Sequence, residues 1–472
     1  MSQQRDYKNS FESRQRAALS ALVLLVALVL SCLGAAVAVS KALKGTEMNL
    51  AQAQIGSMIY VAAAYILFAV YMAVYQRDTF DGAKLMTMVC IQLALMPWMQ
   101  VLGNMLEPHV TPMVMAVLLI AELVNHKTAL AAGVLLGLES AVLAGGTEGL
   151  FTTAAAVMMA ANIASCAASV FALKRINTRG GMIAASGIGG AAGYIAIGAT
   201  VREILTYAGC VLFSALFSGL FVTGSLTIWE ELFDIATPAR LNELLNTGNP
   251  LLKQLMYDAP GTYQHCMNVA ALAEGAAEKI GANALLAKVG AAYHDVGKLR
   301  RPQYFKENQQ AENIHDTLSP QESASIIIAH QKDGATILAK NKLPGAVVRI
   351  AAEHHGNSMM TYFYRKAAET DPNVNPKGFR YPGNKPSTRE GAIVMLADCC
   401  EAAVRSLGDC TREAREAMVH KIIWSKLTDG ENQLSEVPLT LADISSIEKS
   451  FLRTFGGLMH DRIEYPEEAK KE

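Results

Sequence analysis

Residues 293–298 read Tyr-His-Asp-Val-Gly-Lys, and this stretch decides the fold of the C-terminal half. Apolar residues at helical spacing over 283–296 lead into His294 and Asp295, and Gly297 suits the turn that ends a helix. A histidine and a carboxylate side by side at a rigid helix end offer the ligands that borderline divalent metals prefer. The stretch therefore predicts a metal site built on helices.

Helical apolar spacing continues on both sides of this stretch, and no alternating β pattern is sustained. Thr237-Pro238 supplies a capping hydroxyl and a proline suited to the first helical position. Glycine, proline and asparagine separate the segments. We expect an all-α domain with helices over 238–257, 262–280, 283–296, 320–340, 344–355, 389–407, 411–427 and 440–458.

Histidines are concentrated in the same region. A lone helical histidine is usually a satisfied core residue, but six of the chain's ten histidines lie between positions 265 and 355. Asp398 adds a carboxylate directly after an apolar run, where a bare charge is costly without a cation partner. Helical bundles build dinuclear sites from such side chains. The six histidines are His265, His294, His315, His330, His354 and His355.

The N-terminal half has a different composition. From Ala17 to Trp229, 213 residues carry 17 of the chain's 83 charged residues. A membrane-spanning helix needs roughly 20 apolar residues. Candidate spans are 18–39, 54–75, 84–102, 108–123, 128–145, 150–173, 181–200 and 205–228. We therefore expect a cytosolic tail over 1–17, a polytopic transmembrane bundle of about eight spans over 18–229 with 18–39 as a signal anchor, a cytosolic domain over 230–460 and a polar tail over 461–472.

Basic residues in short loops predict the orientation. The N-terminal tail is basic, and Lys174, Arg175 and Arg179 lie together between the sixth and seventh spans. Eight crossings from a cytosolic N-terminus return the chain to the cytosol, so we expect a multi-pass protein of the lipid bilayer. The net charge of −1 favours no DNA or RNA polymer as a partner.

Two features of the membrane half are ambiguous. Residues 187–193 are glycine-rich, but no strand precedes them, so close helix packing is favoured over a phosphate loop. Glu139 lies within the fifth span, where a carboxylate often marks a functional site. A paired structural carboxylate is equally compatible with the sequence.

The order H…HD…H…HH…D resembles that of the HD-domain metal-dependent phosphohydrolases. Further segments make the chain similar to the bacterial seven-transmembrane-receptor HD hydrolases, whose characterised members degrade cyclic di-AMP. The resemblance covers about residues 54–460, most tightly 232–407. Such relatives usually carry a large extracellular domain after the first span, and the short link from Ser40 to Ala53 predicts that this chain lacks it. The further segments are 249–252, 259–263, 293–298, 304–309 and 362–364.

The resemblance implies a protein of the bacterial inner membrane whose catalytic domain lies in the cytosol. It also implies that this domain holds a dinuclear centre with two divalent ions, Mn²⁺ or Fe²⁺. It assigns Lys298 to a substrate phosphate and makes His294, Asp295 and Lys298 the catalytic set. His315 matches no ligand position. The implied ligands are His265, His294, Asp295 and Asp398 for the first ion, and His330, His354 and His355 for the second, with Asp295 bridging.

The implied reaction is hydrolysis of cyclic di-AMP to pApA by a water that two metal ions activate. Tyr362 and Tyr364 are candidates to stack an adenine, although core packing suits them equally. Arg365 and Arg380 are candidates to neutralise phosphate charge, with a solvated basic loop as the alternative. These four residues form the predicted substrate contacts.

Other functions compatible with the residues are hydrolysis of cyclic di-GMP or another nucleotide, and a nucleotide-binding membrane receptor without turnover. A degenerate ligand set would favour the receptor, and here all seven ligand residues are present. The sequence leaves open the base preference, the loaded metal, any regulating ligand and whether the chain forms a homodimer.

Overall fold

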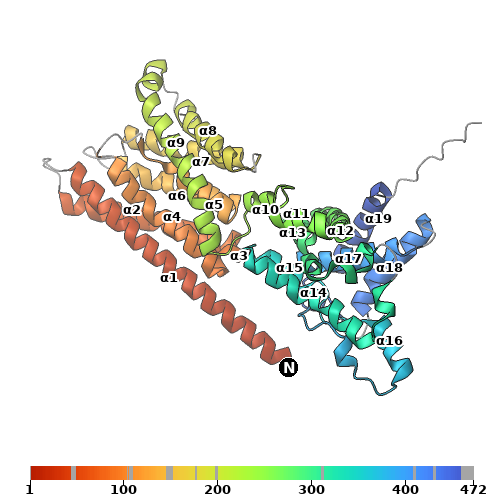
Figure 1. Cartoon of the computed structure of the whole chain (residues 1–472). Helices are drawn as coiled ribbons and strands as arrows, with labels where there is room; N and C mark the ends of the chain where they lie inside the picture. The colour runs from red at the N-terminus through yellow and green to blue at the C-terminus, as the bar shows by residue number, and fades with distance from the viewer. Residues whose placement is uncertain are drawn as a thin grey trace, which may run out of the picture. The chain divides into compact units, whose positions relative to one another are not determined.

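The computed structural model describes residues 2–43, 49–103, 105, 110–144, 152–175, 178–196, 200–309, 313–407, 411–428 and 432–458. The predicted tail over 461–472 lies outside these residues. In the described part of the chain the regular elements are helices, and one isolated β-bridge joins Met359 to Arg380. The all-α prediction is confirmed. The chain forms two compact units, Met1–Ala239 and Arg240–Glu472 (Figure 1).

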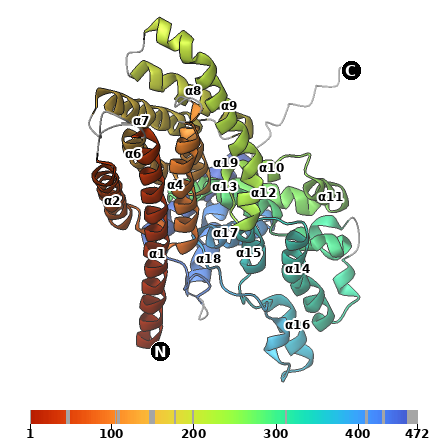
Figure 2. The same cartoon turned by 90° about the vertical axis from the view of Figure 1, so that its left-hand side faces the viewer.

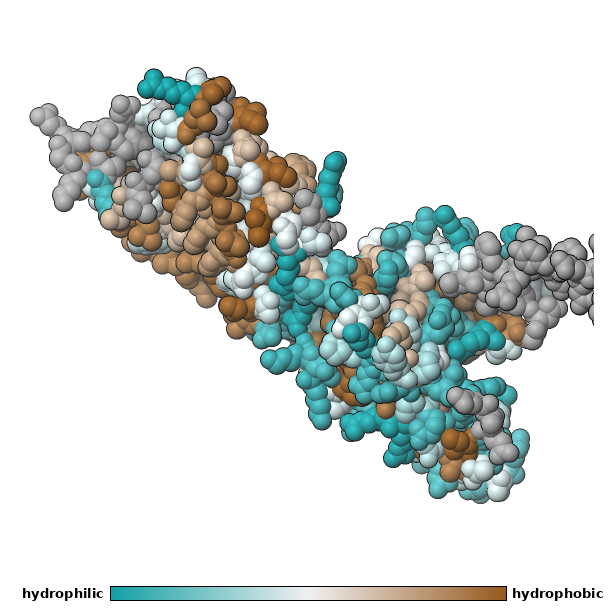
Figure 3. Space-filling model, turned by 45° about the horizontal axis from the view of Figure 1, so that its top comes forward, coloured by the Kyte–Doolittle hydropathy of each residue, from teal (hydrophilic) through white to brown (hydrophobic). Residues whose placement is uncertain are grey.

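The first unit contains the apolar helices. Five of its described helices contain a stretch that is long and apolar enough to cross a membrane, and Figure 3 shows a mainly hydrophobic surface on this unit. The predicted number of about eight spans stays a prediction. These five helices are α1 (Ser2–Ala42), α2 (Leu50–Tyr75), α4 (Ala83–Gly103), α7 (Thr153–Leu173) and α9 (Val201–Leu232), and the others are α3 (Arg77–Asp81), α5 (Met113–Leu123), α6 (His126–Ala144) and α8 (Arg179–Ala196).

Glycines let α8 pack closely on α7. A Cβ added at Gly189 would meet the side chain of Ser169, and one added at Gly193 would meet the side chain of Ser165. Larger residues at these two positions would push the helices apart, as is usual for small residues at helix contacts in lipid. The glycine-rich segment therefore serves helix packing here.

The two units divide after Ala239, ten residues beyond the end predicted for the membrane domain. The reason is that α9 continues to Leu232 and the following segment packs on the first unit. Glu230 is fully buried, and its Oε2 lies 3.2 Å from Nη2 of Arg179. Thr237 donates its hydroxyl to the same carboxylate. These contacts hold residues 233–237, between α9 and the helix that begins at Pro238, against the first unit.

The second unit is a bundle of shorter helices with a largely hydrophilic surface (Figure 3). The predicted helix over 238–257 is wrong, because the side chain of Asn249 accepts hydrogen bonds from the backbone of a new helix that begins at Pro250. The helices are α10 (Pro238–Leu244), which begins at the boundary between the units, α11 (Pro250–Asp258), α12 (Pro260–Lys279), α13 (Ala284–Tyr293), α14 (Pro320–Lys340), α15 (Gly345–Glu353), α16 (Thr361–Thr370), α17 (Arg389–Arg405), α18 (Arg412–Thr428) and α19 (Leu441–Leu458), with the short 3₁₀ helix η3 (Val296–Arg300).

The core of this unit surrounds α12, which contacts α13, α17 and α19 (Figure 2). Val269 and Leu272 of α12 are fully buried, as are Val394 and Leu396 of α17. Ser319 begins α14 with a capping box, in which its side chain and that of Glu322 satisfy backbone donors. This packed framework fixes the helix ends that carry the predicted ligands.

Candidate metal centre

The seven predicted ligand residues lie close together in the second unit, although they come from five separate parts of its sequence. His265 lies within α12, His330 within α14 and Asp398 within α17. The other four follow helix ends: His294 and Asp295 come directly after α13, and His354 and His355 come directly after α15. Six of the seven are buried, and the seventh, His355, has a side chain that is 21% exposed.

A first group consists of His265, His294 and Asp398, whose ligand atoms all lie within 4.8 Å of one another. Nε2 of His265 lies 3.1 Å from Oδ1 of Asp398, and Nε2 of His294 lies 3.8 Å from the same oxygen. Oδ2 of Asp295 is 3.6 Å from Nε2 of His265 and 3.3 Å from Nε2 of His294. Two imidazole nitrogens and two carboxylates thus surround a position that one metal ion could occupy.

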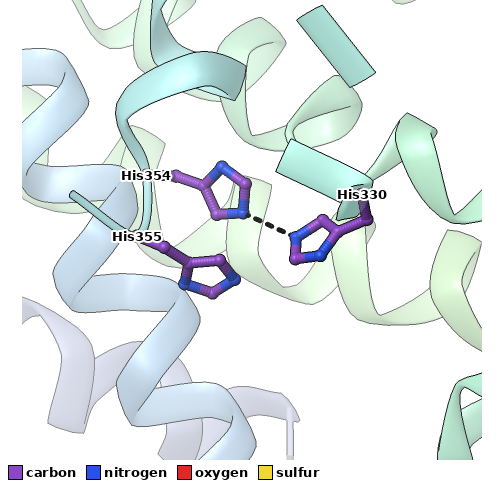
Figure 4. A group of neighbouring side chains, drawn as sticks. All are labelled: His330, His354 and His355. Carbon is purple, nitrogen blue, oxygen red and sulfur yellow. Dashed lines mark hydrogen bonds between the residues drawn. The ribbon is translucent and has the colours of Figure 1, made fainter. Parts of the chain in front are cut away.

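A second group consists of His330, His354 and His355, whose rings face one another across a small gap (Figure 4). Nε2 of His330 lies 3.2 Å from Nε2 of His354. Oδ1 of Asp295 is 3.2 Å from Nε2 of His330 and 3.7 Å from Nε2 of His354. Asp295 therefore turns one oxygen toward each group, which is the arrangement that a bridging carboxylate requires.

The hydrogen bonds of the ring Nδ1 atoms set the tautomers of four histidines. A backbone carbonyl or a carboxylate oxygen only accepts hydrogen bonds, so each of these Nδ1 atoms carries a proton and Nε2 is the ring nitrogen that faces the centre. The bonds run from His294 to the Ala291 carbonyl at 2.7 Å, from His330 to the Ile327 carbonyl at 2.5 Å, from His354 to the Ala351 carbonyl at 2.7 Å, and from His265 to Oε2 of Glu401 at 2.5 Å.

These tautomers test whether the residues fit metal ions. Nε2 of His330 and Nε2 of His354 lie 3.2 Å apart, a contact that needs either a proton or a metal ion between the two nitrogens. Among the residues that the structure describes, none makes a hydrogen bond with the buried Nε2 of His294 or Oδ1 of Asp295. Nitrogen and carboxylate donors in this pattern fit divalent cations such as manganese, iron or zinc. The donor set thus fits two divalent ions.

Cys266 also lies near this centre. Its sulfur is 3.8 Å from Nδ1 of His294. That nitrogen already donates to a backbone carbonyl, so it offers no lone pair to a metal that Cys266 could share. We therefore leave Cys266 out of both groups.

Lys298 lies beside the bridging carboxylate. Its Nζ is 2.7 Å from Oδ2 of Asp295 and 2.7 Å from Oε1 of Glu307, and it lies over the ring of Phe305. Burial alone would raise the pKa of Asp295, but Lys298 and then His294 hold that pKa well below its usual value. Asp295 is therefore ionised, and the single positive charge of Lys298 is shared between two carboxylates.

The histidines of the two groups differ in charge. Burial, followed by the neighbouring His294 and His330, lowers the pKa of His354 to about 3, so this ring is neutral and ready to bind a metal. Burial also opposes a charge on His265, but hydrogen bonds with Asp398 and Glu401 raise its pKa to about 9. A proton on Nε2 of His265 or a metal ion bound there places a positive charge beside the carboxylate of Asp398.

The predicted substrate contacts lie on α16 and the loop after it. Tyr362 is 69% exposed, and Tyr364 packs its ring against Phe379. Arg365 is exposed, and Arg380 donates to the carbonyl of Asn357. Their role in substrate binding stays a prediction.

Three residues near the centre escaped the sequence reasoning. Glu401 orients His265, Glu307 holds Lys298, and the ring of Tyr381 lies 4.3 Å from that of His355. Glu401 follows Asp398 by three positions, a spacing that places both on one helix face and could have revealed it. His315, which had no predicted role, is buried and donates from Nε2 to the carbonyl of Tyr304.

Gly297 is expected to be essential to this arrangement. A Cβ at this position would meet the carbonyl oxygen of His330 and the backbone nitrogen of Gly334 on α14. We expect Gly297→Ala to lower the free energy of unfolding by about 1–3 kcal/mol, the range for overpacking, and to lower bound metal by displacing His330. Thermal unfolding and elemental analysis measure the two effects.

Gly378→Ala is the matched control, because nothing lies within 4 Å of a Cβ built there. A Gly297→Ala protein with the stability and metal content of the wild type would show that η3 and α14 need not approach this closely.

Comparison with known proteins places this centre in a family. Residues 262–403 match the model of the HD domain, and residues 51–237 match the model described as a 7TM receptor with intracellular HD hydrolase. Successive parts of the chain thus resemble the membrane region of such a receptor and its HD domain. The apolar helices and this match make the chain a membrane protein. The HD-domain match spans all seven clustered residues and implies binding of divalent metal.

Two curated relatives of the chain are named cyclic di-AMP phosphodiesterase PgpH. The chain is 47% identical over 259 residues to the Bacillus subtilis protein. This aligned region covers 55% of this chain and 36% of the relative. It is 45% identical over 253 residues to the Listeria monocytogenes protein, and that aligned region covers 53% of this chain and 35% of the relative. A crystal structure of the L. monocytogenes PgpH HD domain with cyclic di-AMP is 46% identical and covers 46% of this chain and 100% of that domain, with a TM-score of 0.44. The chain thus spans about a third of the length of the curated relatives.

Proposed function

We propose that this chain is a membrane-bound, metal-dependent phosphodiesterase that hydrolyses cyclic di-AMP to pApA. The observation that carries the proposal is Asp295, whose two oxygens face two separate groups of histidines at 3.2–3.7 Å. The names of the curated relatives support cyclic di-AMP as the substrate. The basic residues beside the predicted spans support a catalytic unit in the cytoplasm and a bilayer at the bacterial inner membrane.

Mn²⁺ or Fe²⁺ is the proposed metal, because the donors are imidazole nitrogens and carboxylate oxygens with no thiolate. When bound, such a pair of ions polarises a phosphodiester and activates its attacking water. The chain's own residues fix the geometry: Asp295 spans the two groups, Glu401 orients His265, and Lys298 keeps Asp295 ionised. His294 and Asp295 act as ligands in this proposal, and Lys298 as the cation beside them.

A cavity beside the second group suits an anionic nucleotide. It has a volume of about 490 Å³, within the range of about 300–1,000 Å³ that is common for ligand sites. His330 and Phe305 line it together with Arg300 and Arg301. Asp333 also lines the cavity and lies 3.8 Å from Nε of Arg300, so Arg301 supplies most of the positive charge that a substrate with two phosphodiesters would meet. We propose this cavity as part of the substrate site, in addition to the predicted contacts on α16.

The test is incubation of the purified full chain with Mn²⁺ or Fe²⁺ and a panel of cyclic dinucleotides, with products separated by chromatography. We expect pApA from cyclic di-AMP, no product after chelation, and recovery when metal is restored. Faster cleavage of cyclic di-GMP would favour the alternative substrate. Binding of cyclic di-AMP without any product from metal-loaded protein would favour a receptor without turnover.

The receptor alternative is less well supported, because all seven ligand residues are present and clustered. A single cyclic dinucleotide, and no DNA or RNA polymer, is the proposed partner. A homodimer stays a prediction, which the mass of the detergent-solubilised protein tests.

A further inference from the structure

An apolar groove lies between α2 and α6 on the surface of the first unit, and the proposed reaction gives it no role. Its volume is about 420 Å³, which is again within the range of ligand sites. Phe68 and Leu135 form its floor and are 5% and 1% exposed, so the two helices close tightly beneath it. Leu67 and Val134 stand on its rims and are 67% and 46% exposed.

The setting of the groove indicates what fills it. α2 is one of the helices that are long and apolar enough to cross a membrane. In a bilayer, exposed apolar side chains on such a helix face lipid tails, whereas in water a patch of this kind would mark a binding surface. The occupant that matches these walls is a hydrocarbon chain.

One end of the groove is charged. Lys127 lies in its lining near the start of α6, and Leu138 lies in the lining near the other end. These two positions are 11 residues apart, which is about 16 Å of helix at 1.5 Å per residue and close to half of a hydrocarbon core of about 30 Å. The groove therefore has the depth of one leaflet, with a cation where a headgroup would lie.

Lys127 is available for such a headgroup. Its side chain is exposed, and within the described part of the chain no carboxylate lies within ion-pair distance of it. A lysine at the membrane surface favours anionic lipid by about 1 kcal/mol, which corresponds to about a fivefold preference. The groove thus combines an apolar channel with an anion-binding end.

We propose that the α2–α6 groove binds a phospholipid with a net negative headgroup, whose acyl chain lies between Leu67 and Val134 and whose phosphate contacts Lys127. The site is separate from the metal centre and does not depend on the proposed reaction. It makes the membrane unit selective for the lipid that surrounds it.

The test is native mass spectrometry of the full chain released from detergent, after exposure to equal amounts of phosphatidylglycerol and phosphatidylcholine with the same acyl chains. The wild type is expected to retain phosphatidylglycerol about fivefold over phosphatidylcholine. Lys127→Ala is expected to remove the preference while lipid of both kinds still binds. Lys41→Ala, which removes one charge in the last turn of α1, is expected to keep it.

A second variant tests the groove itself. Val134 is exposed on the rim, so Val134→Trp adds bulk across the groove without entering the packed interior, and we expect it to lose retained lipid of both kinds. An unchanged preference in Lys127→Ala, or unchanged lipid retention in Val134→Trp, would overturn the proposal. The proposal would also be overturned if the wild type formed a dimer without bound lipid and Val134→Trp were monomeric. That result would assign the groove to a second copy of the chain.

Discussion

Asp295→Asn is expected to reduce the proposed hydrolysis of cyclic di-AMP by roughly 10²–10³-fold or more, the loss that removal of one well-placed charge contact causes in other enzymes. The native carboxylate faces both histidine groups and lies 2.7 Å from Nζ of Lys298. An amide keeps the shape but loses the negative charge, and it places an NH₂ group beside either a cation site or Lys298. We expect bound metal to fall together with turnover, as elemental analysis would measure.

The matched control is Asp371→Asn, which makes the same chemical change at an exposed residue whose carboxylate caps a nearby turn. Circular dichroism should show that both variants keep their helix content. Wild-type turnover in Asp295→Asn would contradict the assignment of Asp295 as the bridging carboxylate and would leave the two histidine groups without a common role.

Glu401→Gln is expected to weaken metal binding by about 10–100-fold, the usual effect of changing the partner that orients a ligating histidine. Glu401 accepts the Nδ1 proton of His265 at 2.5 Å, while Asn268 and Arg405 approach the same carboxylate. A glutamine oxygen still accepts that proton, so the ring keeps its tautomer. The loss of charge makes His265 a weaker base and therefore a weaker ligand.

Metal titration of the reaction rate distinguishes this role from a catalytic one. Glu401→Gln should need more metal to reach half of its maximal rate and should recover at saturating metal, whereas Asp295→Asn should not recover. Glu416→Gln, on the exposed face of α18, should leave the titration unchanged. A Glu401→Gln variant that stays slow at saturating metal would place Glu401 in the reaction itself.

The sequence predicted the helical class and the residues that cluster, because both depend on local pattern. Apolar spacing identifies helices wherever one face is buried, and four of the seven clustered residues directly follow helix ends, while the other three lie within helices. Charge content likewise separated the apolar half from the polar half. The two compact units divide ten residues beyond the predicted end of the membrane domain, because Glu230 is buried against Arg179, a contact between distant segments.

The sequence by itself determined which side chains can bind a metal, since ligand chemistry belongs to the residue. The resemblance implied how these side chains divide between two ions, but only the tertiary structure brings each group together and turns Asp295 toward both. It also paired His265 with Glu401 across 136 positions, and it paired Lys298 with two carboxylates. Distances between remote positions depend on how helices pack against one another, and no local pattern in one sequence records that packing.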